Sequence, residues 1–248
     1  MAKKKSHKNS FSFSKAGWAG FALLMLGLAV FAGIYFDQNT RITAVEFTGH
    51  TFTNEADLQK AFESPVGVLA DSVNYSAIYS SVHALPWVRD VNVRMAFRGV
   101  LTVEIDERDP VGMLAGNSRM SFFDEDGVLL KAPLGKHIDV PLVYGFRSAA
   151  AGDTLKGSGF EEVKSFLIAS KKEPFTWATI SEVAWNKNEG VVALSTENGV
   201  KLLFGRGDFD NKVQHWKEFN RSVVANKGIN SFRSVDLRFR NQIVTDEI

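Results

Sequence analysis

The stretch from Gly17 to Phe36 constrains this chain more than any other part of its sequence. Its 20 residues include no Asp, Glu, Lys or Arg, and a helix of that length spans about 30 Å, the thickness of a bilayer's hydrocarbon core. The residues before it are basic with no acidic residue, and Asp37 follows it. The positive-inside rule therefore predicts a cytoplasmic tail over 1–16, a single transmembrane helix over 17–36 and an exported remainder.

A cleaved signal peptide is the alternative for the same stretch. An apolar signal region usually covers about 7 to 15 residues, and this run is longer. The best pair of small residues for cleavage, Val30 and Ala32, lies deep inside the run. We therefore expect a retained anchor in the inner membrane, with the C-terminus in the periplasm.

The composition of the chain fits an exported globular part without disulfide bonds. There is no cysteine, the formal net charge is +1, and 45% of the residues are apolar. A chain of this length can bury a core without disulfides, and its mixed charges form no nucleic-acid stripe. These properties argue against a small disulfide-rich module and against a nucleic-acid-binding protein.

The first exported segment has the pattern of a small α+β module. Alternation predicts elements in the order strand, helix, helix, strand, strand, and Thr53 and Asn54 can cap the first helix. The elements cover residues 42–47, 55–62, 75–85, 87–93 and 100–107. Trp87, at the junction of the second helix and the next strand, is interpreted as a core aromatic rather than a partner-docking side chain.

The residues around this last hairpin resemble a known family. The segments PWVRDVNVR at 86–94, LTVEI at 101–105 and ERDPV at 107–111 are similar to the end of a polypeptide-transport-associated (POTRA) domain, as found in the FtsQ/DivIB family of bacterial cell-division proteins. The resemblance implies a basic tail, one membrane helix, a POTRA domain over 41–109 and a β-rich domain over 110–248.

The second exported segment is predicted to be a larger α+β domain, an antiparallel sheet with flanking helices. Its turn signals include Gly116-Asn117, 124–127 and Asn198-Gly199. Asp208 is expected to cap a helix in which apolar residues recur every three or four positions. The chain is expected to close on two strands over 232–239 and 242–245.

The C-terminal residues also resemble the FtsQ/DivIB pattern. FGRGD at 204–208 and VDLRF at 235–239 stand where the family has LGRG and VDLRY. The resemblance implies that the end of this sheet is an edge to which FtsB adds a strand, together with its coiled-coil partner FtsL, while the POTRA domain binds other division proteins. The residues implied for this partner-binding surface are Arg206, Arg238, Phe239, Asn241, Gln242 and Ile243.

A sheet edge offers unpaired backbone N–H and C=O groups, so an edge at the end of the chain must be shielded or used. From the residues alone, a twisted edge blunted by Arg238 and Arg240 is the alternative to a docking edge. With the resemblance, we predict that charge reversal at Arg238 or proline within 242–244 abolishes FtsB binding without unfolding the domain.

No catalytic, metal or cofactor site is predicted. The five histidines form no zinc motif, no thiol exists, and the acidic turn at 124–127 has Gly135 where a calcium loop needs its bidentate acid. Two alternatives remain. One is an anchored cell-wall enzyme using carboxylates such as Glu104 and Asp106, and the other is a POTRA-type transport or chaperone component. The favoured hypothesis is a non-catalytic scaffold of the division complex at the septum.

Overall fold

A computed structural model describes residues 15–38, 40–115, 120–133, 135–147 and 150–248. The helix α1 (Lys15–Gln38) covers the stretch predicted to cross the membrane. Among the described residues no helix is both long and apolar enough to span a bilayer; the side chains of residues 15, 16, 19 and 32–38 are outside that description. Residues 1–14 of the predicted tail over 1–16, and the predicted turn at Gly116-Asn117, also lie outside it.

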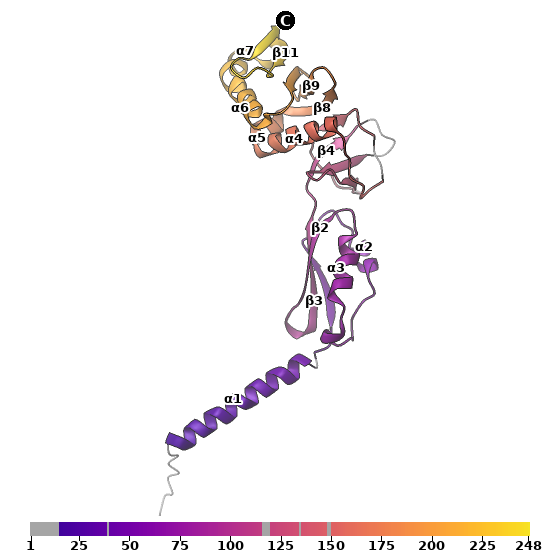
Figure 1. Cartoon of the computed structure of the whole chain (residues 1–248), viewed down its shortest axis with the longest axis vertical. Helices are drawn as coiled ribbons and strands as arrows, with labels where there is room; N and C mark the ends of the chain where they lie inside the picture. Colours follow the sequence, from indigo (N-terminus) through magenta and orange to yellow (C-terminus); the bar gives the residue numbers. More distant parts are fainter. Residues whose placement is uncertain (1–14, 39, 116–119, 134, 148–149) are drawn as a thin grey trace, which may run out of the picture.

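The first domain has the predicted order of elements (Figure 1). They are β1 (Ala44–Thr48), α2 (Glu55–Ala61), α3 (Tyr75–His83), β2 (Val88–Met95) and β3 (Val100–Glu107), with short 3-10 turns at Ala70–Ser72 and Phe97–Gly99. The sheet order is β1-β3-β2, with β1 parallel and β2 antiparallel to β3. The side chain of Asn54 caps α2 as predicted, by accepting from the Ala56 amide.

The second domain is built on one sheet of nine strands, in the order β12-β11-β10-β9-β8-β7-β4-β5-β6. The first four along the chain are β4 (Pro110–Leu114), β5 (Ser121–Asp124), β6 (Leu129–Lys131) and β7 (Leu142–Tyr144). The others are β8 (Ile180–Asn186), β9 (Gly190–Ser195), β10 (Lys201–Gly205), β11 (Phe232–Asp236) and β12 (Val244–Glu247).

This sheet is mixed, and the prediction of an antiparallel sheet was wrong. The pairs β4/β7, β7/β8 and β10/β11 are parallel. Parallel neighbours need long connections, and α6 (Phe209–Phe219) provides the one between β10 and β11. The predicted hairpin at Asn198-Gly199 is confirmed, since both residues have positive φ, 58° and 59°.

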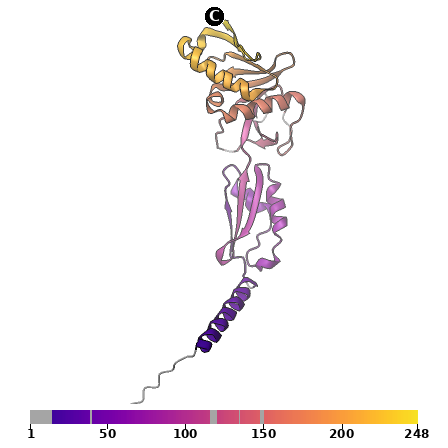
Figure 2. The same cartoon turned by 60° about the vertical axis from the view of Figure 1, so that its left-hand side comes forward.

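The helices of this domain pack on one face of the sheet (Figure 2). They are α4 (Ser158–Lys172), α5 (Pro174–Thr179), α6 and, after a π-helical turn at Asn220–Val224, α7 (Ala225–Lys227), followed by a 3-10 turn at Ile229–Ser231. Apolar residues of α4 and α6 enter the main core, where Phe166 and Trp216 are almost fully buried. The short α5 was not predicted.

Two further expectations about the C-terminal region were wrong. Asp208 precedes α6 in a left-handed conformation (φ 53°), and its side chain makes no capping bond to the backbone. Its carboxylate accepts from the side-chain amide of Asn211 instead. The strand β11 is shorter than expected, because it ends at Asp236. The last strand, β12, has the expected length but begins two residues later, at Val244. The residues between them form the β11–β12 connection.

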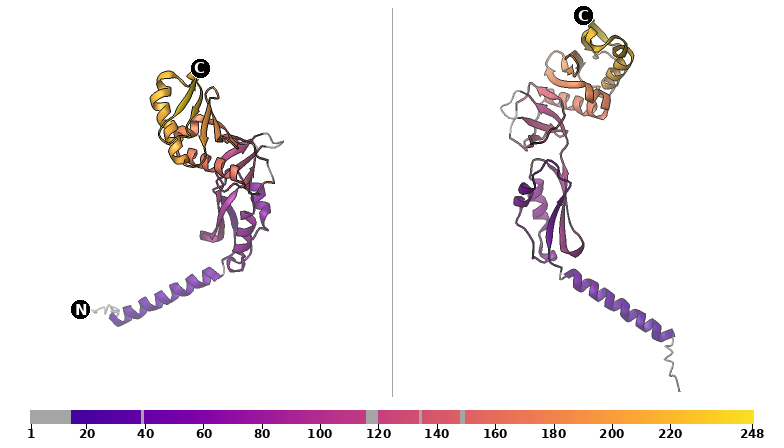
Figure 3. Two further views of the ribbon diagram at one scale, coloured as in Figure 1. Left: turned by 45° about the horizontal axis from the view of Figure 1, so that its top comes forward. Right: turned by 180° about the vertical axis from the view of Figure 1, so that it is seen from behind.

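The two domains meet end to end along the long axis of the molecule (Figure 3). Trp87 is buried as predicted, but it packs with Phe122 and Leu130 of the second domain and donates its Nε1–H to the Lys131 carbonyl at 2.9 Å. Its burial therefore depends on contact between the domains.

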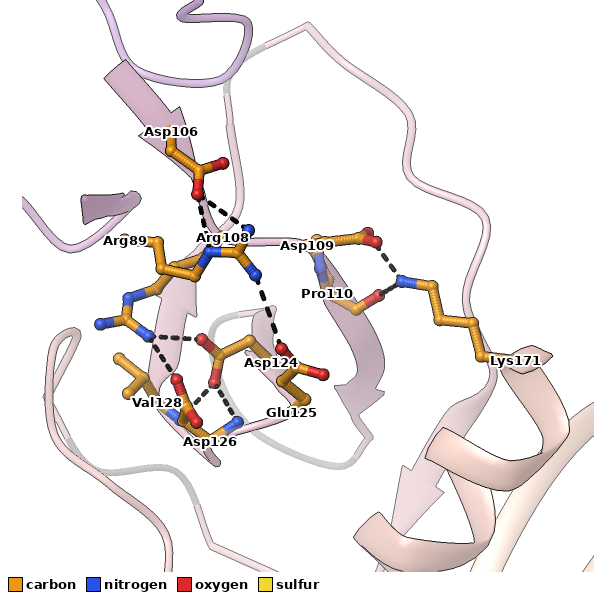
Figure 4. Close-up of polar contacts among 10 residues, drawn as sticks. All are labelled: Arg89, Asp106, Arg108, Asp109, Pro110, Asp124, Glu125, Asp126, Val128 and Lys171. Atoms are coloured by element: carbon orange, nitrogen blue, oxygen red, sulfur yellow. Dashed lines mark hydrogen bonds and ion pairs between the residues drawn. The ribbon is translucent and has the colours of Figure 1, made fainter. Parts of the chain in front are cut away.

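Ion pairs surround the same joint (Figure 4). Arg108 lies 2.6 Å from Asp124 and 3.2 Å from Asp126, so the acidic turn at 124–127 holds a guanidinium. Lys171 of α4 contacts the Asp109 carboxylate at 2.7 Å and the Pro110 carbonyl at 2.9 Å. These contacts tie the turn and α4 to the segment that joins the two domains.

Candidate partner-binding site

The strand β12 ends the nine-stranded sheet, and alternate backbone groups on it face away from β11. The Ile248 amide donates to the Ser231 carbonyl at 3.0 Å, and Asp246 and Val244 are opposite Ser234 and Asp236. In an antiparallel ladder every second residue bonds to the neighbouring strand. The N–H and C=O groups of the residues between them, Thr245 and Glu247, therefore point to the open side.

The opposite end of the sheet is closed by the chain itself. The strand β6 has only three residues, and the Leu129 amide donates to the Asp153 carbonyl while its carbonyl accepts from the Gly152 amide, both at 2.8 Å. This segment satisfies β6 as a neighbouring strand would. Within the described part of the second domain, β12 is the sheet end that no other segment pairs.

Arg238 lies just after β11 and is already engaged inside the protein. Its Nε and Nη2 atoms donate to the two carboxylate oxygens of Asp236 at 2.9 and 2.5 Å. Burial raises the pKa of Asp236, but its bonds with Arg238 outweigh this effect, and the pKa lies below its usual range. The aliphatic part of Arg238 covers Gly205, where an added Cβ would lie 2.8 Å from the Arg238 Cγ.

Arg206 follows β10 and is exposed, and its backbone carbonyl is bonded to Lys212. Its guanidinium lies 5.3 Å from the Trp185 ring centre and donates to the Lys187 carbonyl at 2.6 Å. The ammonium of Lys212 donates to the carbonyls of Arg206 and Gly207, both at 2.8 Å. Burial lowers the pKa of Lys212, although nearby acidic groups oppose the shift. Arg206 is thus presented to solvent from a fixed turn.

The remaining predicted residues lie in the β11–β12 connection. Phe239 is 44% exposed, and Asn241 and Gln242 are exposed as well. Ile243 is partly buried and packs against the main core. Together with residues of α6, the connection lines a surface groove of about 470 Å³. The packing of Ile243 against the main core anchors the connection.

Sequence reasoning missed four residues that shape this site: Asp236, Lys212, Thr245 and Glu247. Asp236 could have been found, because side chains at i and i+2 of an extended segment share a face. The roles of Thr245 and Glu247 depend on register, which the sequence did not specify.

The carboxylates considered for cell-wall chemistry are engaged in ordinary surface pairs. Asp106 accepts from Arg89 at 2.8 Å, and Glu104 lies 3.9 Å from Arg94, with all four side chains about half exposed. In the described part of the chain, no three His, Cys, Asp or Glu side chains gather as a metal site would require.

The fold and this edge define a class: a POTRA domain followed by a β domain. The description "POTRA domain, FtsQ-type" matches residues 40–108, and "FtsQ/DivIB, C-terminal related" matches residues 109–246. The chain belongs to the FtsQ/DivIB family of cell-division proteins. It is therefore a non-catalytic division protein that acts at the septum with partners of the division complex.

Curated relatives agree with this assignment over most of the chain. The cell division protein FtsQ of Rhodothermus marinus is 28% identical over 219 residues, which cover 85% of this chain and 79% of that protein. The FtsQ of Coxiella burnetii is 23% identical over 245 residues, or 97% and 95% of the two chains. The extracytoplasmic domain of DivIB from Geobacillus stearothermophilus has 16% identity and a TM-score of 0.34, covering 49% of this chain and 98% of that one.

Proposed function

We propose that the protein is a membrane-anchored scaffold that binds FtsB, with FtsL, by adding a strand of FtsB to β12. The open edge of β12 carries this proposal, because Thr245 and Glu247 turn unpaired backbone groups outward while β6 is closed by its own chain. Strand addition uses such main-chain groups for affinity and nearby side chains for specificity. Arg206, Arg238, Phe239, Asn241 and Gln242 would supply those side chains.

The register of β12 against β11 determines which substitutions remove an outward backbone donor and can therefore test docking. Gln242 lies before β12, and Val244 turns its N–H toward β11, so proline at either of these positions would not remove an outward donor of β12. Proline at Thr245 removes one outward N–H and leaves the inward bonds in place, as edge strands tolerate. Thr245→Val is the matched control, since it keeps the backbone donor.

The test measures the affinity of the purified full chain in detergent for the FtsB–FtsL complex. Thr245→Pro is expected to weaken binding about tenfold or more, because a lost hydrogen bond and a distorted added strand act together. Thr245→Val is expected to stay within about twofold, by the same affinity arithmetic. Wild-type affinity in a folded Thr245→Pro variant would exclude strand addition at β12.

Arg238 needs a paired substitution. Charge reversal there would place a second acid beside Asp236, whose side chain is only 12% exposed, and so would disturb the fold. The double variant Asp236→Asn/Arg238→Gln removes both charges at once. We expect weaker FtsB binding with an unchanged unfolding transition; unchanged binding would remove Arg238 from the surface.

Membrane anchoring belongs to the same proposal. The uninterrupted apolar run over 17–36, preceded by lysines, supports a single-pass inner-membrane protein with its C-terminus in the periplasm. Extraction of cell membranes with alkaline carbonate tests it. The protein is expected to stay in the pellet, and release into the supernatant would contradict an anchor.

A further inference from the structure

The POTRA domain has its own open edge at β1, and the chain already uses part of it. Just before β1, the Ile42 amide donates to the Val68 carbonyl at 2.9 Å, and the Ile42 carbonyl accepts from the Gly67 amide at 2.8 Å. Next to Ile42 this segment bends in a turn closed by the Val68 amide and the Pro65 carbonyl at 3.0 Å. The rest of β1 has no neighbouring strand on that side among the described residues.

The hydrogen bonds between β3 and β2 show which backbone N–H and C=O groups of β1 point to the open side. The Ala96 amide donates to the Val100 carbonyl at 2.7 Å, so Val100 faces β2. Alternation then turns Leu101 and Val103 toward β1.

In a parallel ladder, a residue bonds to the two neighbours of its register partner. Val45 is the register partner of Leu101 and Phe47 that of Val103, so the inward bonds of β1 fall on Ala44, Glu46 and Thr48. Val45 and Phe47 therefore direct their N–H and C=O groups to the open side.

A groove lies beside the same two residues. Their side chains line a depression of about 420 Å³ between β1 and α2, together with Phe62 and Val66. Val66 is 51% exposed. An added strand would place alternate side chains over this groove, and apolar ones would bury the exposed surface.

The charge of Glu46 favours a particular kind of side chain on the other face of an added strand. Glu46 is exposed on the side of the sheet away from the helices and makes no ion pair among the described residues. A side chain opposite Glu46 on an added strand would be a cross-strand neighbour, and a basic one would be favourable. Arg41, the nearest basic residue along the strand, donates to the Gly67 carbonyl.

The β1 edge is also the less protected edge of its sheet. The strand β2 at the other side has a register shift between Val88 and Asp90, and carries Arg89, Asp90 and Arg94. Bulges and charges of this kind discourage strand pairing. The register of β1 is unbroken from Ala44 to Thr48, with no proline or lysine.

We propose that β1 of the POTRA domain is a second docking edge, which binds an extended segment of a partner protein with alternating apolar and basic residues. The apolar side chains lie over the groove beside Phe62 and Val66, and a basic side chain pairs with Glu46. This site lies in the other domain from β12 and does not depend on FtsB docking.

The probe is a fluorescein-labelled seven-residue peptide of alternating lysine and valine, added to the full chain in a neutral detergent and followed by anisotropy. The chain is expected to bind it more tightly than the same peptide with glutamate in place of lysine. Glu46→Lys should weaken binding about fivefold to tenfold, since it turns an attraction into a repulsion. Glu197→Lys, the same change at an exposed turn of the second domain, is the control.

Backbone pairing is read separately. Only every second amide of an added peptide strand bonds to β1. N-methylation of that set of amides should abolish binding, and N-methylation of the other set should leave binding unchanged. Amide exchange by NMR should slow at Val45 and Phe47 when the peptide binds, and stay unchanged at Thr245 and Glu247. Absence of binding, protection at β12 alone, or equal effects of Glu46→Lys and Glu197→Lys would each overturn the proposal.

Discussion

Glu107, the last residue of β3, is an example of one side chain that organises a loop. Its carboxylate accepts from the backbone amides of Thr51, Phe52 and Thr53 at 2.5 to 3.0 Å. Burial raises the pKa of Glu107, but hydrogen bonds from Thr53, Phe52 and Thr51 outweigh it, and the net shift is downward. Phe52 packs against Trp87 with ring centres 4.8 Å apart and ring planes tilted by 31°, so this loop also shapes the joint.

The first prediction concerns the charge of Glu107. Glu107→Gln is expected to lower the free energy of unfolding at pH 7 by roughly 1 to 2 kcal/mol, because three amides lose an ionised acceptor. A depressed carboxyl pKa stabilises the fold above the unfolded value of about 4.3, and this contribution disappears as pH falls through the folded value.

Urea unfolding of both proteins at pH 7 and near pH 3 measures this difference. The gap between wild type and variant should close at the lower pH. Glu63→Gln, on an exposed carboxyl, is the control and should change little at either pH. An equal gap at both pH values would contradict the role given to the charge.

At the scale of elements, the close approach of the β8–β9 turn to the end of β10 decides the shape of the site. Gly190 has φ 80°, and a Cβ there would lie 2.4 Å from the carbonyl carbon and oxygen of Gly205. Arg238 in turn covers Gly205, where an added Cβ would lie 2.8 Å from its Cγ, so Gly205 lies between this turn and Arg238.

The second prediction separates the cost of a positive φ from the cost of a steric clash with a neighbouring backbone. Gly190→Ala is expected to cost about 3 kcal/mol of stability, from positive φ and a backbone clash together. Gly199→Ala has φ 59° but open space around its Cβ, so only the conformational cost of about 1 kcal/mol applies. Thermal unfolding of the two variants checks this, and equal losses would show that the contact with Gly205 can relax.

At the scale of the whole molecule, the joint between the domains rests on a buried ion pair. The side chains of Arg108 and Asp124 are 15% and 3% exposed. The Asp124 carboxylate also accepts from the Val128 amide at 2.8 Å, which fixes it inside its turn. We therefore expect this arrangement to hold the two domains at a set direction to each other.

The third prediction is that Arg108→Met destabilises the protein by roughly 3 kcal/mol, because it leaves the Asp124 carboxylate buried without its partner. Arg94→Met removes an arginine from an exposed pair, with side chains 56% and 54% exposed, and should cost under about 0.5 kcal/mol.

Spin labels at the exposed residues Lys60 and Lys187 report the joint directly. Their distance distribution is expected to broaden in Arg108→Met and to stay narrow in Arg94→Met. A narrow distribution in both variants would show that the packing of Trp87 is sufficient to hold the two domains.

The POTRA domain was largely predictable because its signals are local. Asn54 caps α2 as its position before an amphipathic run predicted, and β3 alternates as VLTVEIDE does. The second domain was less predictable, because the pairing of β10 with β11 bridges a long connection and leaves no period in the sequence.

By itself, the sequence determined most of the segments that form helices and strands, although not α5 or the bounds of β11 and β12. It also determined the absence of disulfides and the apolar run at 17–36, since these depend on composition and on periods of a few residues. Only the tertiary structure decided the mixed sheet, the pairing of Arg238 with Asp236, and the use of Arg108 and Trp87 between the domains. It also decided that Thr245 and Val45 face open edges. Register and long-range pairing set these features. A shift of one residue in register would turn the backbone groups of Thr245 and Val45 away from the open edges without changing any local pattern.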